Sequence, residues 1–164
     1  EAMHTGHSVY ATMHANSAAE TISRLINPPL SVPPNLLNAV NLNVVMFRDR
    51  RKGIRRVFQV AEFNANGDRA EANLLYRWIP ENDSKIKHSE NSKFFEDISK
   101  NTGMTQEELE KNLEEKKYII TWLIKNNIRS LKDFKRVISH YYSNKDNLLK
   151  EIRQNNVKMF KEEN

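Results

Sequence analysis

The sequence predicts a mixed fold of the α/β or α+β class, and three features predict it. A short β-branched and aromatic run, residues 8–14, is followed at once by the pattern of a helix start. Three more strand-like runs lie between residues 42 and 79, separated by turn residues. After residue 92, apolar residues recur at helical spacing almost to the end of the chain.

The first predicted strand covers Ser8 to His14 and carries bulk on both faces, which is typical of a strand covered on both sides in a parallel sheet. Ser17 and Glu20 then form a capping-box pattern, in which the hydroxyl and the carboxylate each accept a hydrogen bond from a backbone amide. The predicted helix has one apolar side and ends before the proline pair 28–29. A second proline pair opens a short helix.

An antiparallel meander of three strands is predicted next. Residues 42–47 and 56–63 form a hairpin around a basic turn that contains Gly53, and a turn at Gly67 leads to a third strand at residues 73–79.

The rest of the chain is predicted to be helical. Pro80 and the polar stretch that follows break the strand pattern, so residues 81–92 are predicted to be a linker. Residues 93–155 form the predicted helical subdomain, with a second capping box at Thr105, and residues 156–164 are predicted to be a frayed tail.

Composition sets limits on the function. The chain has 164 residues, a net charge of +5 and no cysteine, so disulfide and thiolate chemistry are excluded. No apolar run approaches the ~18–20 residues that span a bilayer, and no membrane insertion is expected. The basic balance is compatible with a nucleic-acid partner, but acidic residues are interspersed throughout, which favours a solvated surface.

Several segments resemble one family. They are Thr5-Gly6-His7, Thr12-Met13-His14-Ala15-Asn16-Ser17 and Ser23-Arg24-Leu25, with the proline-rich link, the basic hairpin and residues 122–130. Together they resemble the histidine box, its flanks and the tail of the hexameric P-loop NTPases that power type II and type IV secretion, type IV pili and the archaellum. The resemblance covers most of residues 1–142, and its last segment is most similar to archaeal members.

This resemblance implies that residues 1–80 are the C-terminal part of a RecA-like ATPase domain, with residues 8–14 at the edge of its sheet. The parent protein is then expected to be a hexamer that uses ATP and Mg²⁺. Its expected place is the cytoplasmic face of a membrane, where its partner is a polytopic membrane platform protein. Whether the machine secretes proteins, builds a pilus or drives an archaellum does not follow from the sequence.

The resemblance also implies roles for single residues. His14 is the expected catalytic residue near the γ-phosphate, where an imidazole N–H can donate a hydrogen bond to phosphoryl oxygens. Its expected place, a strand end followed by a helix N-terminus, is where open α/β sheets bind ligands and where phosphate is favoured. The other expected roles are nucleotide or loop support for Thr12, Asn16 and Ser17, and a subunit interface for Arg24, Arg55 and Arg56.

One departure from the family pattern concerns the phosphate loop. The four glycines, at positions 6, 53, 67 and 103, cannot form G-x-x-x-x-G-K-[ST], and the acidic boxes of the family would lie before Glu1. We therefore expect a C-terminal fragment that by itself binds no ATP or Mg²⁺ and does not hydrolyse ATP.

The histidines, the basic hairpin and the function each allow an alternative interpretation. The spacing of His4, His7 and His14 fits no standard zinc pattern, so no metal is expected. The basic hairpin, Arg48–Arg56, is either a solvated turn or a contact with a subunit or nucleotide, and nucleic acid is less favoured because no stacking aromatics are interleaved. The alternative function is a stand-alone interaction module that binds nucleic acid through this hairpin or the helical tail.

Overall fold

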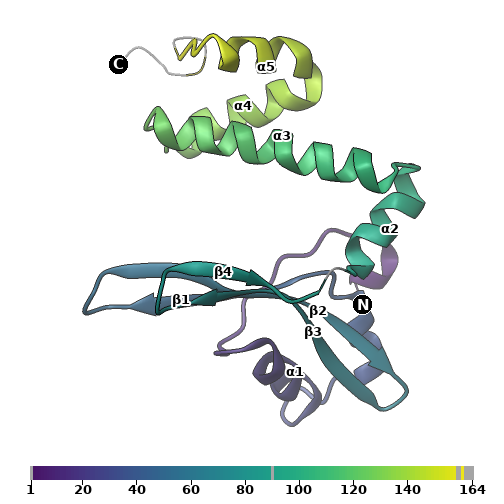
Figure 1. Ribbon diagram of the computed structural model, residues 1–164. Helices are drawn as coiled ribbons and strands as arrows, with labels where there is room; N and C mark the ends of the chain where they lie inside the picture. The colour runs from purple at the N-terminus through teal and green to yellow at the C-terminus, as the bar shows by residue number, and fades with distance from the viewer. Residues whose placement is uncertain (1, 90, 158–159, 161–164) are drawn as a thin grey trace. The chain divides into compact units, whose positions relative to one another are not determined.

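The computed structural model describes residues 2–89, 91–157 and 160, without the side chains of Ala2 and His4. The chain divides into two compact units, residues 1–102 and 103–164 (Figure 1). The division lies ten residues after the stretch predicted as the linker.

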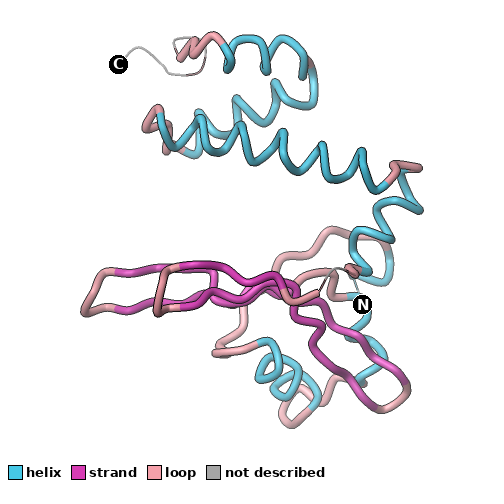
Figure 2. Tube along the Cα trace, in the orientation of Figure 1, coloured by secondary structure: helices cyan, strands magenta, loops and turns pink. Residues whose placement is uncertain are grey.

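The first unit is built on a four-stranded antiparallel sheet in the order β1-β2-β3-β4, shown in magenta in Figure 2. Its strands are β1 (Asn43–Asp49), β2 (Ile54–Asn66), β3 (Arg69–Ile79) and β4 (Ser84–Lys87). The pairing shifts register between Val45 and Met46 on β1 and between Val60 and Ala61 on β2. With the helices described below, this arrangement confirms the α+β class and adds one strand to the predicted three.

The additional strand, β4, lies inside the stretch that was predicted to be a linker. Asp83, at φ 50°, turns the chain, and its carboxylate accepts two hydrogen bonds of 2.7 Å from the Arg56 guanidinium on β2. The Trp78 indole N–H donates to the same carboxylate at 2.7 Å. These bonds fold the chain back onto β3. Sequence pattern missed the strand because Ser84–Lys87 contains a single apolar residue, Ile86.

Two short helical elements, α1 (Ala18–Ile26) and the 3-10 helix η2 (Pro34–Ala39), pack against the sheet. Their apolar side chains meet those of β1 and β2 in a core of Ala18, Ile22, Leu37, Val45, Ala61 and Phe63. An earlier 3-10 helix, η1 (Ala2–Thr5), precedes them.

The predicted strand at residues 8–14 is wrong. These residues are irregular and exposed, with Tyr10 99% exposed. A strand needs a neighbour to satisfy its backbone groups, and the four described strands pair only with one another. No edge of a parallel, RecA-like sheet is present in the described residues.

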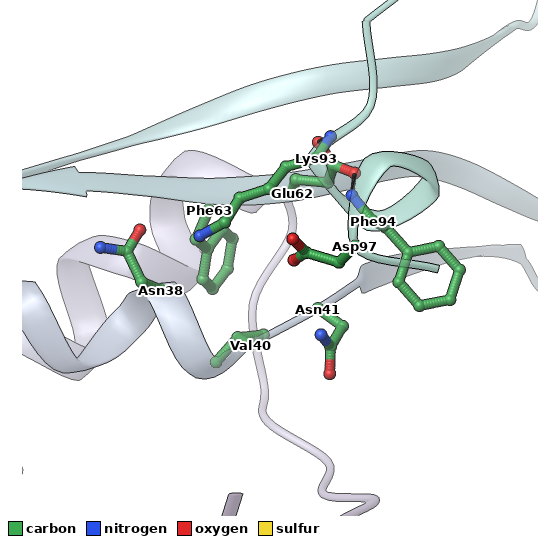
Figure 3. Close-up of a pocket in the computed structure, with 8 residues that line it drawn as sticks. All are labelled: Asn38, Val40, Asn41, Glu62, Phe63, Lys93, Phe94 and Asp97. Carbon is green, nitrogen blue, oxygen red and sulfur yellow. Dashed lines mark hydrogen bonds between the residues drawn. The ribbon is translucent and has the colours of Figure 1, made fainter. Parts of the chain in front are cut away.

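A buried carboxylate fixes α2 (Lys93–Thr102) to the sheet. Glu62 is only 2% exposed and lies on the face of β2 opposite to Ala61 and Phe63. It accepts hydrogen bonds from the backbone N–H groups of Lys93 (3.1 Å) and Phe94 (2.8 Å) at the start of α2 (Figure 3). Two side-chain donors complete the set, the Ser92 hydroxyl at 2.5 Å and the Asn73 amide at 3.2 Å.

The second unit is helical, as predicted, and consists of α3 (Gln106–Lys125), α4 (Leu131–Ser143) and α5 (Lys145–Arg153). Both bonds of the capping box at Thr105 form, and Ser130 caps α4. The core is made of Ile119, Trp122, Leu123, Ile128, Val137, Tyr141, Leu148, Ile152 and Phe160. Phe160 lies in the stretch predicted to be a frayed tail, and its ring is buried against Trp122. Residues 158–159 and 161–164 lie outside the described residues.

Replacing Glu62 tests the anchor of α2. Burial raises the pKa of Glu62, but the hydrogen bonds from Ser92 and the α2 amides outweigh it, so the pKa is lowered. The resulting stability is present above the unfolded pKa of about 4.3 and is lost as pH falls through the lower folded value. We expect Glu62→Gln to reduce the free energy of unfolding at pH 7 by about 2–4 kcal/mol.

The measurement is guanidinium unfolding followed by Trp78 fluorescence in a Trp122→Phe background, since the two tryptophans lie in different units. Glu71→Gln, an exposed acid on β3, is the matched control and should change stability by less than about 0.5 kcal/mol. Equal stabilities for the two variants would contradict the anchor role of Glu62.

The turn before β4 gives a second prediction. Hydrogen bonds from Arg56, then from Trp78, lower the pKa of Asp83 from 3.8 to about 2. In carboxyl carbon NMR, the Asp83 signal should therefore titrate near 2 and move upward in Arg56→Gln. Because the folded pKa is depressed, this contact stabilises the fold above the unfolded pKa and is lost as pH falls through about 2. An ordinary Asp83 titration in the unsubstituted chain would refute the bidentate contact.

Candidate functional site

The candidate site is the loop of residues 7–16 that leads into α1. His14 is exposed in this loop, and its ring makes no hydrogen bond to any described residue. Thr12 is likewise exposed, with no side-chain hydrogen bond within the described part of the chain. His7 differs, because its Nδ1 lies 2.9 Å from the Thr5 hydroxyl. The loop thus presents the His14 imidazole to solvent, at an irregular segment and not at a strand end.

Hydrogen bonds tie Asn16, the last residue of the loop, and Ser17, the residue that follows it, to α1. The Ser17 hydroxyl accepts a 3.0 Å hydrogen bond from the Glu20 backbone N–H and forms the predicted N-cap. The Glu20 carboxylate bonds one residue earlier than a capping box requires, accepting from the Asn16 backbone N–H (2.8 Å) and side-chain amide (3.1 Å). Asn16 and Ser17 therefore make the bonds that a loop-supporting role requires, and the role itself stays a prediction.

The N-terminus of α1 was expected to favour phosphate. Of its first amides, Ala18 N–H donates to the Gln59 side-chain oxygen on β2 at 2.9 Å, and Glu20 N–H donates to Ser17. Two of the donors that an anion would use are already occupied. The sequence did not indicate a role for Gln59. A glutamine that hydrogen-bonds to another element looks the same in the sequence as a glutamine that faces solvent.

Arg24 lies one turn after Glu20 and forms an ion pair with it at 2.7 Å. The Arg24 side chain is still 49% exposed, so the pair leaves part of the guanidinium open to solvent. The bond from the Asn16 amide, then the Arg24 contact, lowers the pKa of Glu20. Asn16, Glu20 and Arg24 form one connected set next to His14.

The other two residues expected at a subunit interface, Arg55 and Arg56, come from the β1–β2 hairpin. Arg55 is exposed and makes no ion pair with a described residue, whereas Arg56 is engaged by Asp83. No hydrogen bond or ion pair between described residues joins either arginine to the His14 loop. The predicted site residues thus lie in two places. The loop and α1 carry Thr12, His14, Asn16, Ser17 and Arg24, and the β1–β2 hairpin carries Arg55 and Arg56.

Each unit contains a cavity. The first, of about 10 Å³, lies beside Glu62 and α2 and has room for about one water molecule (Figure 3). The second, of about 490 Å³, is an open groove of the helical unit lined by Lys111, Glu114, Glu115, Tyr118, Leu149 and Arg153. Within the described residues, no three His, Asp or Glu side chains come together as a metal site.

Comparisons with known proteins connect the first unit to a family. The family model described as type II/IV secretion system protein matches residues 1–77. An uncharacterized protein of Methanocaldococcus jannaschii is 35% identical over 147 residues, which is 87% of this chain and 20% of the relative. A second uncharacterized protein of that organism is 28% identical over 114 residues, 66% of this chain and 42% of the relative.

A third relative has a stated activity. The type IV pilus assembly ATPase PilB of Pseudomonas aeruginosa is 54% identical over 43 residues, which is 26% of this chain and 7% of PilB. The chain therefore spans less than half the length of each of these relatives. The family match over residues 1–77 and the similarity to PilB over 43 residues confirm that the chain resembles the type II/IV secretion system protein family, as found in the sequence.

Proposed function

We propose that the chain is the C-terminal part of a hexameric ATPase that powers protein secretion or the assembly of pilus-like or archaellum filaments. The observation that carries this proposal is the family match over residues 1–77, together with the similarity to a pilus assembly ATPase. The relatives extend well beyond this chain, which is consistent with a nucleotide cradle built from residues outside it.

In this proposal, the chain contributes the His14 loop to a nucleotide site whose phosphate loop and magnesium ligands precede Glu1. Support comes from the exposure of the ring and from the absence of a competing partner among the described residues. The Ser17 cap and the Asn16–Glu20 bonds hold the C-terminal end of the loop, so the imidazole would be positioned with little loss of backbone freedom. ATP and Mg²⁺ would supply the phosphoryl group and its charge neutralisation when bound.

The proposed partners are further copies of the parent chain and a polytopic membrane platform protein at the cytoplasmic face of the membrane. Arg24 and Arg55, both exposed, are the available guanidinium groups for a subunit contact, and Arg56 is available only if its pair with Asp83 breaks. None of the described helices is long and apolar enough to span a bilayer.

The first test uses the chain of residues 1–164 alone. Because its sequence contains no G-x-x-x-x-G-K-[ST] motif, we expect no ATP hydrolysis above background and no saturable ATP binding in isothermal titration calorimetry with Mg²⁺ present. Measurable turnover by the purified chain would contradict the division of the site between this chain and preceding residues.

The second test concerns His14 in the proposed parent ATPase. We expect His14→Ala to lower kcat by about 10²-fold, as for loss of one transition-state donor, while the Kd for ATP changes by less than about twofold. His88→Ala is the matched control, since His88 is also exposed but lies after β4. Unchanged turnover in His14→Ala would remove this residue from the mechanism without affecting the family assignment.

A further inference from the structure

The two faces of the β1–β2 hairpin differ in whether their side chains have partners in the structure. On one face, Phe47 packs on Trp78 with ring centroids 5.2 Å apart, and Arg56, directly opposite Phe47, is held by Asp83. Phe47 and Arg56 therefore both have partners within the first unit.

The other face carries charge and apolar surface without partners. Met46 lies opposite Val57, and Arg48 lies opposite Arg55, so these four side chains share one face. Met46 is 64% exposed and Val57 is 37% exposed, and Val44 continues the row at 51%. We call these five residues the basic–aliphatic face. Like charges directly opposite each other destabilise a hairpin, and no described acidic residue pairs with Arg48 or Arg55.

The turn of the hairpin adds three cations, Arg50, Arg51 and Lys52, all exposed. The nearby carboxylate of Asp49 accepts hydrogen bonds from the backbone N–H groups of Arg51 (2.8 Å) and Lys52 (3.1 Å), so it stabilises the turn itself. None of the three side chains forms an ion pair with a described residue. The hairpin therefore gathers five uncompensated cations next to exposed aliphatic side chains.

We propose that this hairpin docks on an anionic phospholipid surface, with the five cations at the headgroups and Val44, Met46 and Val57 at the acyl boundary. Exposed apolar patches mark membrane or protein contacts, and clustered Lys and Arg select anionic lipid. The aliphatic neighbours of the cations cannot stack on bases, which disfavours nucleic acid. Neither cavity described above is lined by residues of the basic–aliphatic face, so this face lying on a flat surface fits better than a peptide in a groove.

The proposal assigns Arg55 to lipid in place of the subunit contact considered above. It does not depend on the ATPase assignment and is tested without nucleotide. The 164-residue chain is sedimented with vesicles of phosphatidylcholine alone and of phosphatidylcholine with one third phosphatidylglycerol, at about 0.15 M salt. We expect binding to the anionic vesicles only. Each basic residue removed should weaken partitioning about fivefold, so Arg48→Gln with Arg55→Gln should weaken it by about 25-fold. Met46→Gln should weaken partitioning without changing its salt dependence.

The matched control removes the same charge elsewhere, through Lys111→Gln with Lys125→Gln on α3, both exposed, and should retain most of the binding. In a Trp122→Phe background, Trp78 fluorescence reports whether each variant keeps the fold of the hairpin. Equal binding to both vesicle types, or equal loss in the control, would overturn the proposal. Two other results would also overturn the proposal. One is binding of duplex DNA, and the other is self-association in sedimentation velocity, if either exceeds vesicle binding and is abolished by the Arg48 and Arg55 substitutions.

Discussion

The polar side chains of β2 fix the positions of the elements around that strand. Gln59 accepts from the first amide of α1, Glu62 accepts from the first two amides of α2, and Arg56 holds the turn that begins β4. Each contact satisfies backbone or side-chain groups that would otherwise be partly buried without partners, which is costly in free energy. Glu62 matters most, because its carboxylate is buried and four donors compensate the cost of removing its charge from water.

This arrangement would let an exposed loop hold the proposed functional residue, His14, in a defined position. Ala18 is buried in the core beneath α1, and its amide is bonded to β2, so the start of the helix is fixed. Asn16 and Ser17 are fixed in turn by Glu20, and residues 7–15 before them lack regular structure. His14 thus stands two residues before a rigid anchor. A side chain in that position can be presented to a ligand held by other residues while the local fold is maintained by β2.

Local patterns in the sequence predicted the elements whose stabilising contacts are also local. The capping residues Ser17 and Thr105, the meander and the helical second half all follow from short-range signals. Residues 8–14 have the composition of a strand, but strand formation depends on a neighbour that no pattern within them reveals. The roles of Gln59, Glu62 and Asp83 depend on contacts 41, 31 and 27 positions away, respectively, and were missed for the same reason. Glu62 gave one usable signal, a lone acid within the apolar run 60–63.

The central claim is that His14 faces the terminal phosphoryl group of a nucleotide bound by the rest of a secretion-motor ATPase. The most direct measurement is an experimental structure of the assembled parent protein with a non-hydrolysable ATP analogue and Mg²⁺. The account predicts a ring nitrogen of His14 within about 3 Å of a γ-phosphate oxygen, either directly or through one water. A ring that points into bulk solvent or into a subunit contact remote from the nucleotide would contradict it.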